Sequence, residues 1–298
     1  MEIRTLSEAS AGQLCRRKRK RDGSADALSM HLSLARRPHS VSFPLYFSHT
    51  EQENAHCPVW VPSAGTVGGI SKRMRWRDTE MKKNLTELVM ILDRSGSMGG
   101  LESDTIGGYN SMLRKQREAE GEVLVSTVLF DNTSEVLYDR IPLREMPQMT
   151  EKEYYVRGST ALLDAIGGAI HHIGNVHKYA REEDRPEKTI FVITTDGFEN
   201  ASRRYTYEKV RQMVEQQKEK YGWEFLFLGA NMDAIETAGR FGIAADRAVN
   251  YNSDAVGTAL NYEVLADTVC EMRASAAPID GSWKRRIEAD FDRRGGRK

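Results

Sequence analysis

Five oxygen-bearing residues in three separate segments of the sequence have the types and spacing of a metal-ion site. Asp93, Ser95 and Ser97 stand at alternate positions after an apolar run, and Thr160 and Asp196 follow further along the chain. Magnesium prefers oxygen ligands, uses few carboxylates and retains several waters. Two carboxylates and three hydroxyls therefore favour a hard cation such as Mg²⁺ or Mn²⁺. They also leave at least one of its six coordination positions open for water or an incoming ligand.

The elements that would position these residues are buried parallel strands. The first segment alone is weak support, because Asp, Ser and Gly are also common in turns and at helix N-caps. Residues 88–92 and 189–193, however, are short aliphatic runs that end at turn residues, which is typical of buried strands. Parallel strands place their carboxyl ends on one edge of a sheet, where open α/β folds bind ligands. We therefore expect Asp93, Thr160 and Asp196 to meet at that edge.

From Met81 onward, apolar strands alternate with amphipathic helices, which indicates an α/β fold with helices on both faces of a mostly parallel sheet. The turn between residues 123–130 and 134–137 is so tight that the second of these strands should be antiparallel to the first. We expect about six strands, at residues 88–92, 123–130, 134–137, 189–193, 225–228 and 248–251. Gly222 is placed to end the helix before residues 225–228.

The three segments together resemble the metal-ion-dependent adhesion site of von Willebrand factor A domains. The resemblance extends roughly from residue 84 to residue 275, in motif order, strand context and spacing. The opening Leu-Asp-Arg-Ser-Gly-Ser-Met is similar to that of small stand-alone bacterial members of the family. The resemblance implies a Rossmann-like, doubly wound sheet with one antiparallel edge strand and with Mg²⁺ or Mn²⁺ at its top.

The resemblance also implies how the metal is held. Ser95, Ser97 and Thr160 would contact the ion directly, whereas Asp93 and Asp196 would coordinate it largely through water. With neutral hydroxyls as direct ligands, the ion keeps most of its charge and can accept an Asp or Glu side chain from a partner. The loop Gly158-Ser159-Thr160 differs from that of many relatives, which have a second Gly or Asn there. This difference affects only the expected path of the loop.

The expected function is therefore that of a noncatalytic, metal-dependent protein-binding module. The sequence has no convincing Ser/His/Asp or Cys/His arrangement and no phosphate-binding loop, so we expect no enzyme. Two alternatives stay open: the metal-binding subunit of an ATPase-driven complex, and a Mg²⁺-dependent hydrolase. The hydrolase is disfavoured because Arg94 is the only obvious cation beside the motifs.

Other polar and aromatic residues near the motifs are weaker candidates. Asp131 either orients a metal-bound water or is an ordinary turn residue, and Asp164 either supports the site from behind or caps the helix. Tyr154 and Tyr155 either border a partner site or pack in the core. The histidines at 171, 172 and 177 lack the i,i+4 spacing of a helical zinc pair.

Composition limits the remaining possibilities. The chain of 298 residues has 43 basic and 43 acidic residues, so its formal charge of zero indicates no polyanionic partner. It contains no apolar run long enough to span a bilayer and no recognisable signal peptide. Its three cysteines are too few and too scattered for a disulfide framework or a zinc site. We therefore expect a cytoplasmic protein without membrane or nucleic-acid partners.

The two ends of the chain differ from its centre. Residues 1–80 hold 13 Lys and Arg against 8 Asp and Glu and show no sustained periodicity. We expect either a disordered basic extension or an upstream segment outside the native coding sequence, with translation starting at Met81. Nucleic-acid binding through the basic run at 16–21 and the charged C-terminal tail depends on residues 1–80 being translated. Residues 81–276 are expected to form the domain, and 277–298 a charged, disordered tail.

Overall fold

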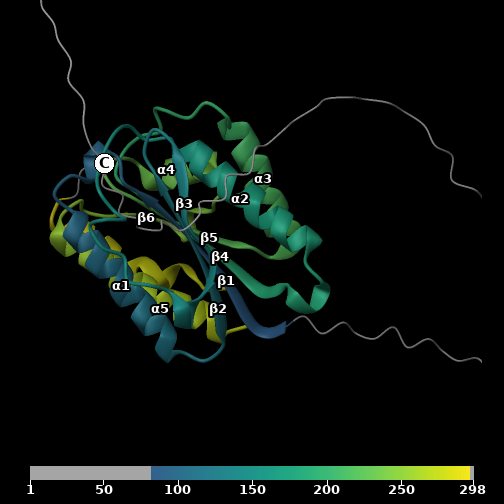
Figure 1. Ribbon diagram of the computed structural model, residues 1–298. Coiled ribbons are helices and arrows are strands. Elements are labelled where there is room, and N and C mark those ends of the chain that lie inside the picture. The colour runs from purple at the N-terminus through teal and green to yellow at the C-terminus, as the bar shows by residue number, and fades with distance from the viewer. Residues whose placement is uncertain (1–81, 296–298) are drawn as a thin grey trace, which may run out of the picture. The chain divides into compact units, whose positions relative to one another are not determined.

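The computed structural model describes residues 82–295, so the predictions for residues 1–80 lie outside the described residues. Six strands form one sheet with helices on both of its faces (Figure 1). The strands are β1 (Lys82–Asp93), β2 (Glu122–Phe130), β3 (Ser134–Pro142), β4 (Pro186–Thr195), β5 (Glu224–Gly229) and β6 (Ala248–Asn250). The helices are α1 (Glu102–Glu118), α2 (Leu162–Tyr179), α3 (Tyr207–Tyr221), α4 (Ala234–Arg240), α5 (Ala255–Ala274) and α6 (Arg285–Arg293).

The sheet has the order β3-β2-β1-β4-β5-β6, and it confirms the predicted fold class. All neighbouring strands are parallel except β2 and β3, which pair antiparallel at one edge. The chain proceeds outward from β1 in one direction through β2 and β3, and then returns to the other side of β1 for β4. The carboxyl ends of β1 and β4 therefore form the topological switch point of the sheet.

Both faces of the sheet are buried, which explains the continuous apolar run in β1. Leu88, Met90 and Leu92 belong to a hydrophobic cluster with α1, α5 and α6, whereas Val89 and Ile91 belong to a second cluster with α2, α3 and α4. Successive side chains of a strand point to opposite faces, so each face receives its own set from the same run. The central strand is thereby fixed on both sides.

The expected helix stop at Gly222 is also confirmed. Gly222 ends α3 in the left-handed conformation with φ of 65°, and its N–H donates to the carbonyls of Gln217 and Lys218. Glycine adopts this conformation without steric cost, which makes it the usual residue at this position. None of the helices in residues 82–295 combines the length and apolar character needed to cross a membrane.

The expectation of a disordered tail is wrong for residues 281–293, which form a short 3₁₀ helix (Gly281–Lys284) and α6. Trp283, Ile287 and Phe291 recur every fourth residue, so they lie on one helical face, and all three are buried. The indole Nε1 of Trp283 donates a 2.8 Å hydrogen bond to the carbonyl of Asp246. An apolar stripe inside a charged sequence thus extends the ordered structure beyond residue 276.

Candidate metal centre

The predicted metal-binding residues gather where β1 and β4 end, at the switch point of the sheet. Asp93 is the last residue of β1, and Asp196 directly follows Thr195, the last residue of β4. Thr160 lies in the loop that leads into α2. The three segments that the sequence places together are therefore adjacent in the fold, at the kind of position where open α/β sheets bind ligands.

The carboxylate of Asp93 is held by groups on both sides of it. Its Oδ1 accepts a 2.7 Å hydrogen bond from the N–H of Ser95, and its Oδ2 accepts a 2.7 Å hydrogen bond from the hydroxyl of Thr195. The N–H of Asp196 lies 3.3 Å from the same Oδ2. Burial raises the pKa of Asp93, and the hydrogen bonds from Ser95 and Thr195 oppose that rise. Oxygens that already accept protein hydrogen bonds are suited to contact an ion through water.

Two of the three hydroxyls, those of Ser95 and Ser97, have the spacing that an octahedral ion requires. The Oγ atoms of Ser95 and Ser97 lie 3.0 Å apart. Neighbouring ligands of Mg²⁺, at about 2.0–2.1 Å from the ion, are separated by about 3 Å. A β-carbon added at Gly197 would lie 3.2 Å from Ser97 Oγ and 3.5 Å from Thr160 Oγ1, so both hydroxyls face that position. Glycine after Asp196 therefore leaves space beside the hydroxyls.

Backbone hydrogen bonds hold Thr160 in this place. The N–H of Gly96 donates to the carbonyl of Gly158 at 3.0 Å, which ties the loop before α2 to the first motif. The N–H of Thr160 donates to the side chain of Asn200 at 2.9 Å, and its carbonyl accepts from the N–H groups of Asn200 and Ala201. Gly158 has φ of 71°, which glycine adopts without strain. The loop is therefore fixed between the β1 and β4 ends.

Asp196 is positioned by two residues whose roles the sequence did not indicate. Its Oδ1 accepts a hydrogen bond from the amide of Asn231, two residues after β5, and its Oδ2 accepts one from the hydroxyl of Ser253, two residues before α5. Asn231 follows the strand that the sequence predicts at residues 225–228, whereas Ser253 stands in a segment with no motif. Groups that orient a metal ligand in this way typically change metal affinity when they are removed.

Asp131 binds arginines, which gives it a structural role. Its Oδ2 accepts from the Nε atoms of Arg94 at 2.9 Å and Arg157 at 2.7 Å. Burial raises the pKa of Asp131, but hydrogen bonds from Arg157, Thr133 and Arg94 outweigh it and hold that pKa below its ordinary value. The buried Arg94 also pairs with Glu135 at 2.8 Å. Arg94, the one cation inside the first motif, is therefore paired with two carboxylates.

The other aromatic and acidic candidates support the site from the surrounding fold. Asp164 accepts hydrogen bonds of 2.9–3.0 Å from the N–H groups of residues 203–205, so it closes the loop that follows Asp196. Tyr154 is buried, and its hydroxyl donates to the carbonyl of Asp93 at 2.5 Å. Tyr155, in contrast, is 43% exposed. Of the two tyrosines, only Tyr155 is available at the surface.

The histidines of α2 do not form a metal centre. The side chains of the three histidines in α2 hydrogen-bond to Asn175, Asp139 and Glu87 respectively. Residues 82–295 contain no group of three or more His, Cys, Asp or Glu that could hold a metal ion. Ser97 is exposed, so the candidate metal site opens to solvent on its side.

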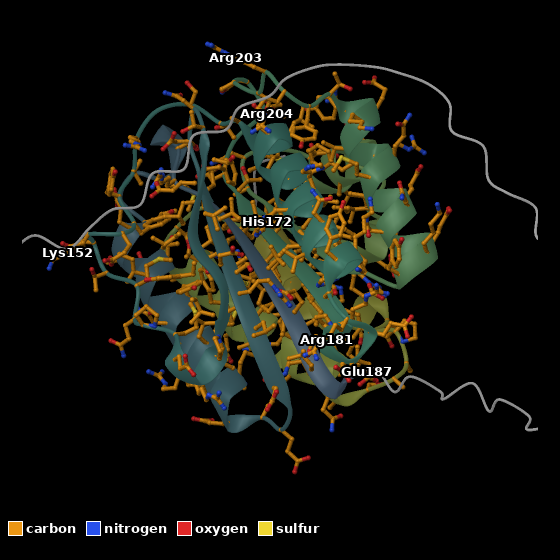
Figure 2. The ribbon with its side chains drawn as sticks, turned by 45° about the vertical axis from the view of Figure 1, so that its right-hand side comes forward. Lys152, His172, Arg181, Glu187, Arg203 and Arg204 are labelled. Carbon is orange, nitrogen blue, oxygen red and sulfur yellow. The ribbon has the colours of Figure 1, made fainter. Side chains whose placement is uncertain are left out.

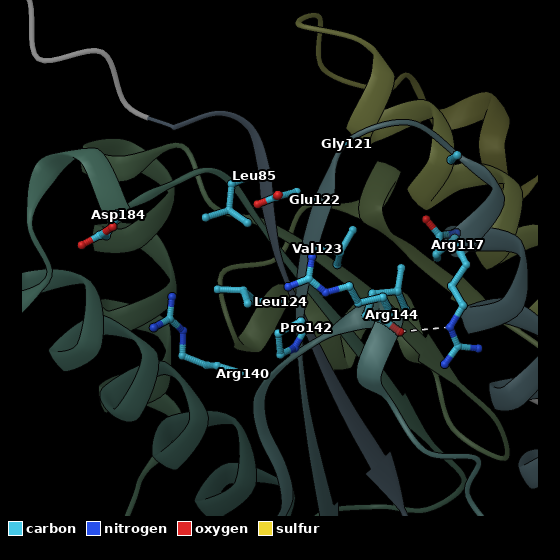
Figure 3. Close-up of a pocket in the computed structure, with 13 residues that line it drawn as sticks. Leu85, Arg117, Gly121, Glu122, Val123, Leu124, Arg140, Pro142, Arg144 and Asp184 are labelled. Atoms are coloured by element: carbon cyan, nitrogen blue, oxygen red, sulfur yellow. Dashed lines mark hydrogen bonds between the residues drawn. The ribbon is translucent and has the colours of Figure 1, made fainter.

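A cavity of about 560 Å³ lies at the opposite end of the sheet, where β2 begins and β3 ends (Figure 3). Apolar side chains, three arginines and the acidic residues Glu122 and Asp184 are among the residues that line it. Arg117 Nε donates to the carbonyl of Leu143 at 3.0 Å, and Arg140 Nε pairs with Glu87 at 2.8 Å. None of the five candidate metal residues lines this cavity, so the two features are separate.

No protein-family model and no curated protein matches the sequence. Among solved structures, the chain is similar to proximal thread matrix protein 1 from the mussel byssus, with 11% identity, coverage of 64% of this chain and 47% of that chain, and a TM-score of 0.43. A crystal structure of that byssus protein is described as having a zinc-occupied MIDAS motif. The chain is also similar to the PilB minor pilin from Streptococcus sanguinis, with 10% identity, 66% and 64% coverage, and a TM-score of 0.46.

A third similar structure is the vWF domain of the type V pili tip protein Mfa5 from Porphyromonas gingivalis, with 11% identity, 66% and 98% coverage, and a TM-score of 0.45. The chain thus spans about half of the byssus protein and under two thirds of PilB. At these identities the likeness concerns the fold alone.

The observed sheet agrees with the fold that the sequence motifs implied. The described residues form a doubly wound sheet with one antiparallel edge strand and helices on both faces, as the resemblance to von Willebrand factor A domains predicts. Asp93, Thr160 and Asp196 lie in the segments that meet at the carboxyl ends of its central strands.

Proposed function

We propose that this protein is a noncatalytic, divalent-metal-dependent protein-binding module. Ser95, Ser97 and Thr160 would contact Mg²⁺ or Mn²⁺ directly, and Asp93 and Asp196 would hold it through water. The observation that carries the proposal is the meeting of hydroxyls from the first motif and from the loop before α2 around Gly197. An acidic side chain, Asp or Glu, from a partner protein would fill the open position.

The arrangement of hydrogen bonds supports this division of roles. The two oxygens of Asp196 accept from Asn231 and Ser253, and those of Asp93 accept from Ser95 and Thr195. Their negative charge is therefore shared with protein donors. Uncharged hydroxyls as direct ligands would leave the ion most of its positive charge, so that it attracts an incoming carboxylate. Two directly bound carboxylates would neutralise that charge.

Binding fits this site better than phosphoryl transfer or hydrolysis. Phosphoryl transfer depends on cations that stabilise charge developing on the phosphate. Arg94, the cation inside the first motif, is 1% exposed and paired with Asp131 and Glu135, so it does not face a ligand.

We also propose that the module acts in the cytoplasm. The compartment can be tested by fractionating the native host, since two of the similar structures are named as pilus proteins.

Affinity capture from a native-host lysate tests the proposed function. The immobilised full chain should retain a partner in the presence of Mg²⁺, release it with EDTA and recover it when Mn²⁺ is added. Asp93→Ala and Thr160→Ala should each abolish capture, whereas Asp292→Ala and Thr237→Ala, on helices α6 and α4, should not. Circular dichroism confirms that each variant is folded. A partner that is retained both by the two site variants and in EDTA contradicts the proposal.

A further inference from the structure

Two aromatic side chains beside the candidate metal site are exposed to solvent. Phe198 is 64% exposed and follows Gly197, which faces the hydroxyls of Ser97 and Thr160. Tyr155 is 43% exposed, and its ring packs against the guanidinium group of Arg157 at 5.1 Å. One exposed aromatic residue needs no explanation, but two that flank a single site form a surface that can bind an apolar group.

Exposed cations lie in the loops that precede Thr160 and follow Asp196. Arg203 and Arg204 follow the β4 motif and Lys152 precedes the Thr160 loop, and all three are exposed and make no ion pair with the described residues (Figure 2). Asp164 binds the backbone N–H groups of Arg203 and Arg204, so their position on the loop is fixed. Arg157 is nearly half exposed although it pairs with the buried Asp131.

The acidic residues of these loops are mostly occupied by the loops themselves. Glu153 accepts hydrogen bonds from the N–H and the hydroxyl of Thr150, at 2.8 and 2.6 Å. Glu199 accepts from the N–H groups of residues 163, 201 and 202. Within the described segments 150–160 and 197–206, Glu151 is the one remaining carboxylate. These two segments therefore present more exposed cations than unengaged carboxylates.

We propose that the partner's metal-binding carboxylate belongs to an acidic protein segment that also carries an aromatic or aliphatic residue. This segment would be recognised by the rim surface, defined as Lys152, Tyr155, Arg157, Phe198, Arg203 and Arg204. The inference rests on the proposed function and adds the chemistry of the partner. Cations attract the additional acidic residues, and the two exposed rings bind the apolar side chain.

A polyanion such as a nucleic acid fits the rim surface less well than an acidic peptide. Nucleic-acid binding derives most of its strength from many phosphate contacts, and single strands are held by extended grooves of cations with stacking aromatics. The rim surface has four cations, of which Arg157 is already paired with Asp131. An acidic segment anchored by a metal-bound carboxylate requires fewer charged contacts.

Selection from a random peptide library displayed on phage tests the inference. The immobilised full chain is exposed to the library with Mg²⁺, and bound phage are eluted with EDTA. We expect the enriched peptides to contain Asp or Glu, a second acidic residue nearby and an aromatic or aliphatic residue. Synthetic versions of the most enriched peptides are then measured for affinity against the wild-type chain and its variants.

The charge-reversing double variant Arg203→Glu with Arg204→Glu should weaken these peptides by about tenfold at low ionic strength, and less at high salt. Its matched control, Lys178→Glu with Lys220→Glu, changes exposed cations at the carboxyl ends of α2 and α3. Those ends lie on the opposite side of the domain, where Arg181 stands in Figure 2. The control should bind the peptides like the wild type.

The double variant Tyr155→Ala with Phe198→Ala should weaken the same peptides by about fivefold or more, as the loss of aromatic interface residues does. Its matched control is Tyr179→Ala with Tyr221→Ala, since these rings are 78% and 62% exposed at the far ends of α2 and α3. Electron paramagnetic resonance should show equal uptake of Mn²⁺ in all four double variants. A loss of peptide affinity can then be assigned to the rim surface and not to the metal site.

The possible results distinguish the rim surface from the proposed function. EDTA-sensitive peptides without acidic or apolar preference, or rim variants that bind as tightly as the wild type, would overturn the inference and leave the metal-dependent module intact. Absence of any EDTA-sensitive peptide would overturn both. EDTA-insensitive binding of heparin or single-stranded DNA that is lost in the charge-reversed variant would assign the surface to a polyanion, and so would also overturn the inference.

Discussion

The hydroxyl of Thr195 donates a 2.7 Å hydrogen bond to Oδ2 of Asp93, which joins the carboxyl ends of the two central strands. Thr195 is fully buried and Asp93 is 1% exposed, so this contact lies inside the fold and beneath the candidate metal position. The carboxylate is therefore oriented by the strands themselves. Orientation before binding reduces the entropic cost of assembling a metal site.

Replacing Thr195 with Val keeps the shape of the side chain and removes the hydroxyl. The buried carboxylate of Asp93 then loses a donor, so the free energy of unfolding should fall by about 1–3 kcal/mol. Urea denaturation in the presence of EDTA measures this change without a contribution from bound metal. Thr258→Val is the control, because its buried hydroxyl has no partner in the described part of the chain and its removal should cost little. Equal stability of Thr195→Val and the wild type contradicts the structural role.

Removing the groups that hold Asp196 should lower metal affinity. Ser253→Ala and Asn231→Ala each free one carboxylate oxygen, and outer partners of metal ligands typically contribute about 10–100-fold in affinity. Isothermal titration with Mn²⁺ measures the effect. Ser111→Ala and Asn175→Ala, on the exposed faces of α1 and α2, should bind Mn²⁺ like the wild type. Unchanged affinity in both site variants would show that Asp196 needs no such support.

Asp131→Asn should destabilise the fold substantially. The substitution leaves the guanidinium of Arg94, which is 1% exposed, without its buried carboxylate, and breaking a buried pair costs about 3 kcal/mol. Arg157→Gln should cost no more than about 1 kcal/mol, because Arg157 is 48% exposed and its pair is screened by water. Chemical denaturation of both variants provides the comparison. The reverse order of stabilities would contradict a buried Arg94–Asp131 pair.

The attachment of α6 should depend on pH. The hydrogen bonds from Arg294 lower the pKa of Asp290, so the folded state favours the charged carboxylate. This stabilisation is complete above the ordinary Asp pKa of about 3.9 and is lost as the pH falls through the lower folded value. The wild type should therefore exceed Asp290→Asn in urea midpoint at neutral pH, and the gap should close below about pH 4.

Asp292→Asn is the control for this prediction. Asp292 is exposed on the same helix, and no ion pair joins it to the described residues, so its replacement should leave the midpoint unchanged throughout. A gap between the wild type and Asp290→Asn that stays constant down to pH 3 would show that Arg294 does not act through the charge of Asp290.

The presence and direction of the strands, and the meeting of the motifs at one edge, could be predicted because they depend on local signals. The apolar run before Asp93 and the run before Asp196 each predict a buried strand, and parallel pairing then brings both strand ends to one edge. The tight turn after β2 likewise determined the antiparallel β3. These inferences need only strand identity and direction.

Residues that act through tertiary contact had no such signal. Ser253 and Asn200 support the site from segments without a motif, and only the folded chain brings them to Asp196 and Thr160. The helix α4 is short. The helix α6 was not predicted, because the segment's charged composition masked the apolar stripe formed by Trp283, Ile287 and Phe291. Composition describes the average of a segment, whereas helix packing depends on the spacing within it.

Titration of the full chain with Mn²⁺ tests the metal centre most directly. Electron paramagnetic resonance should show a single bound ion per chain, which Mg²⁺ displaces. Thr160→Val, which removes one direct hydroxyl ligand and keeps the shape of the side chain, should abolish or strongly weaken uptake. Thr258→Val should leave uptake unchanged. No Mn²⁺ binding by the folded wild type, or equal binding by wild type and Thr160→Val, would contradict a metal held by the hydroxyls of Ser95, Ser97 and Thr160 where three segments of the chain converge.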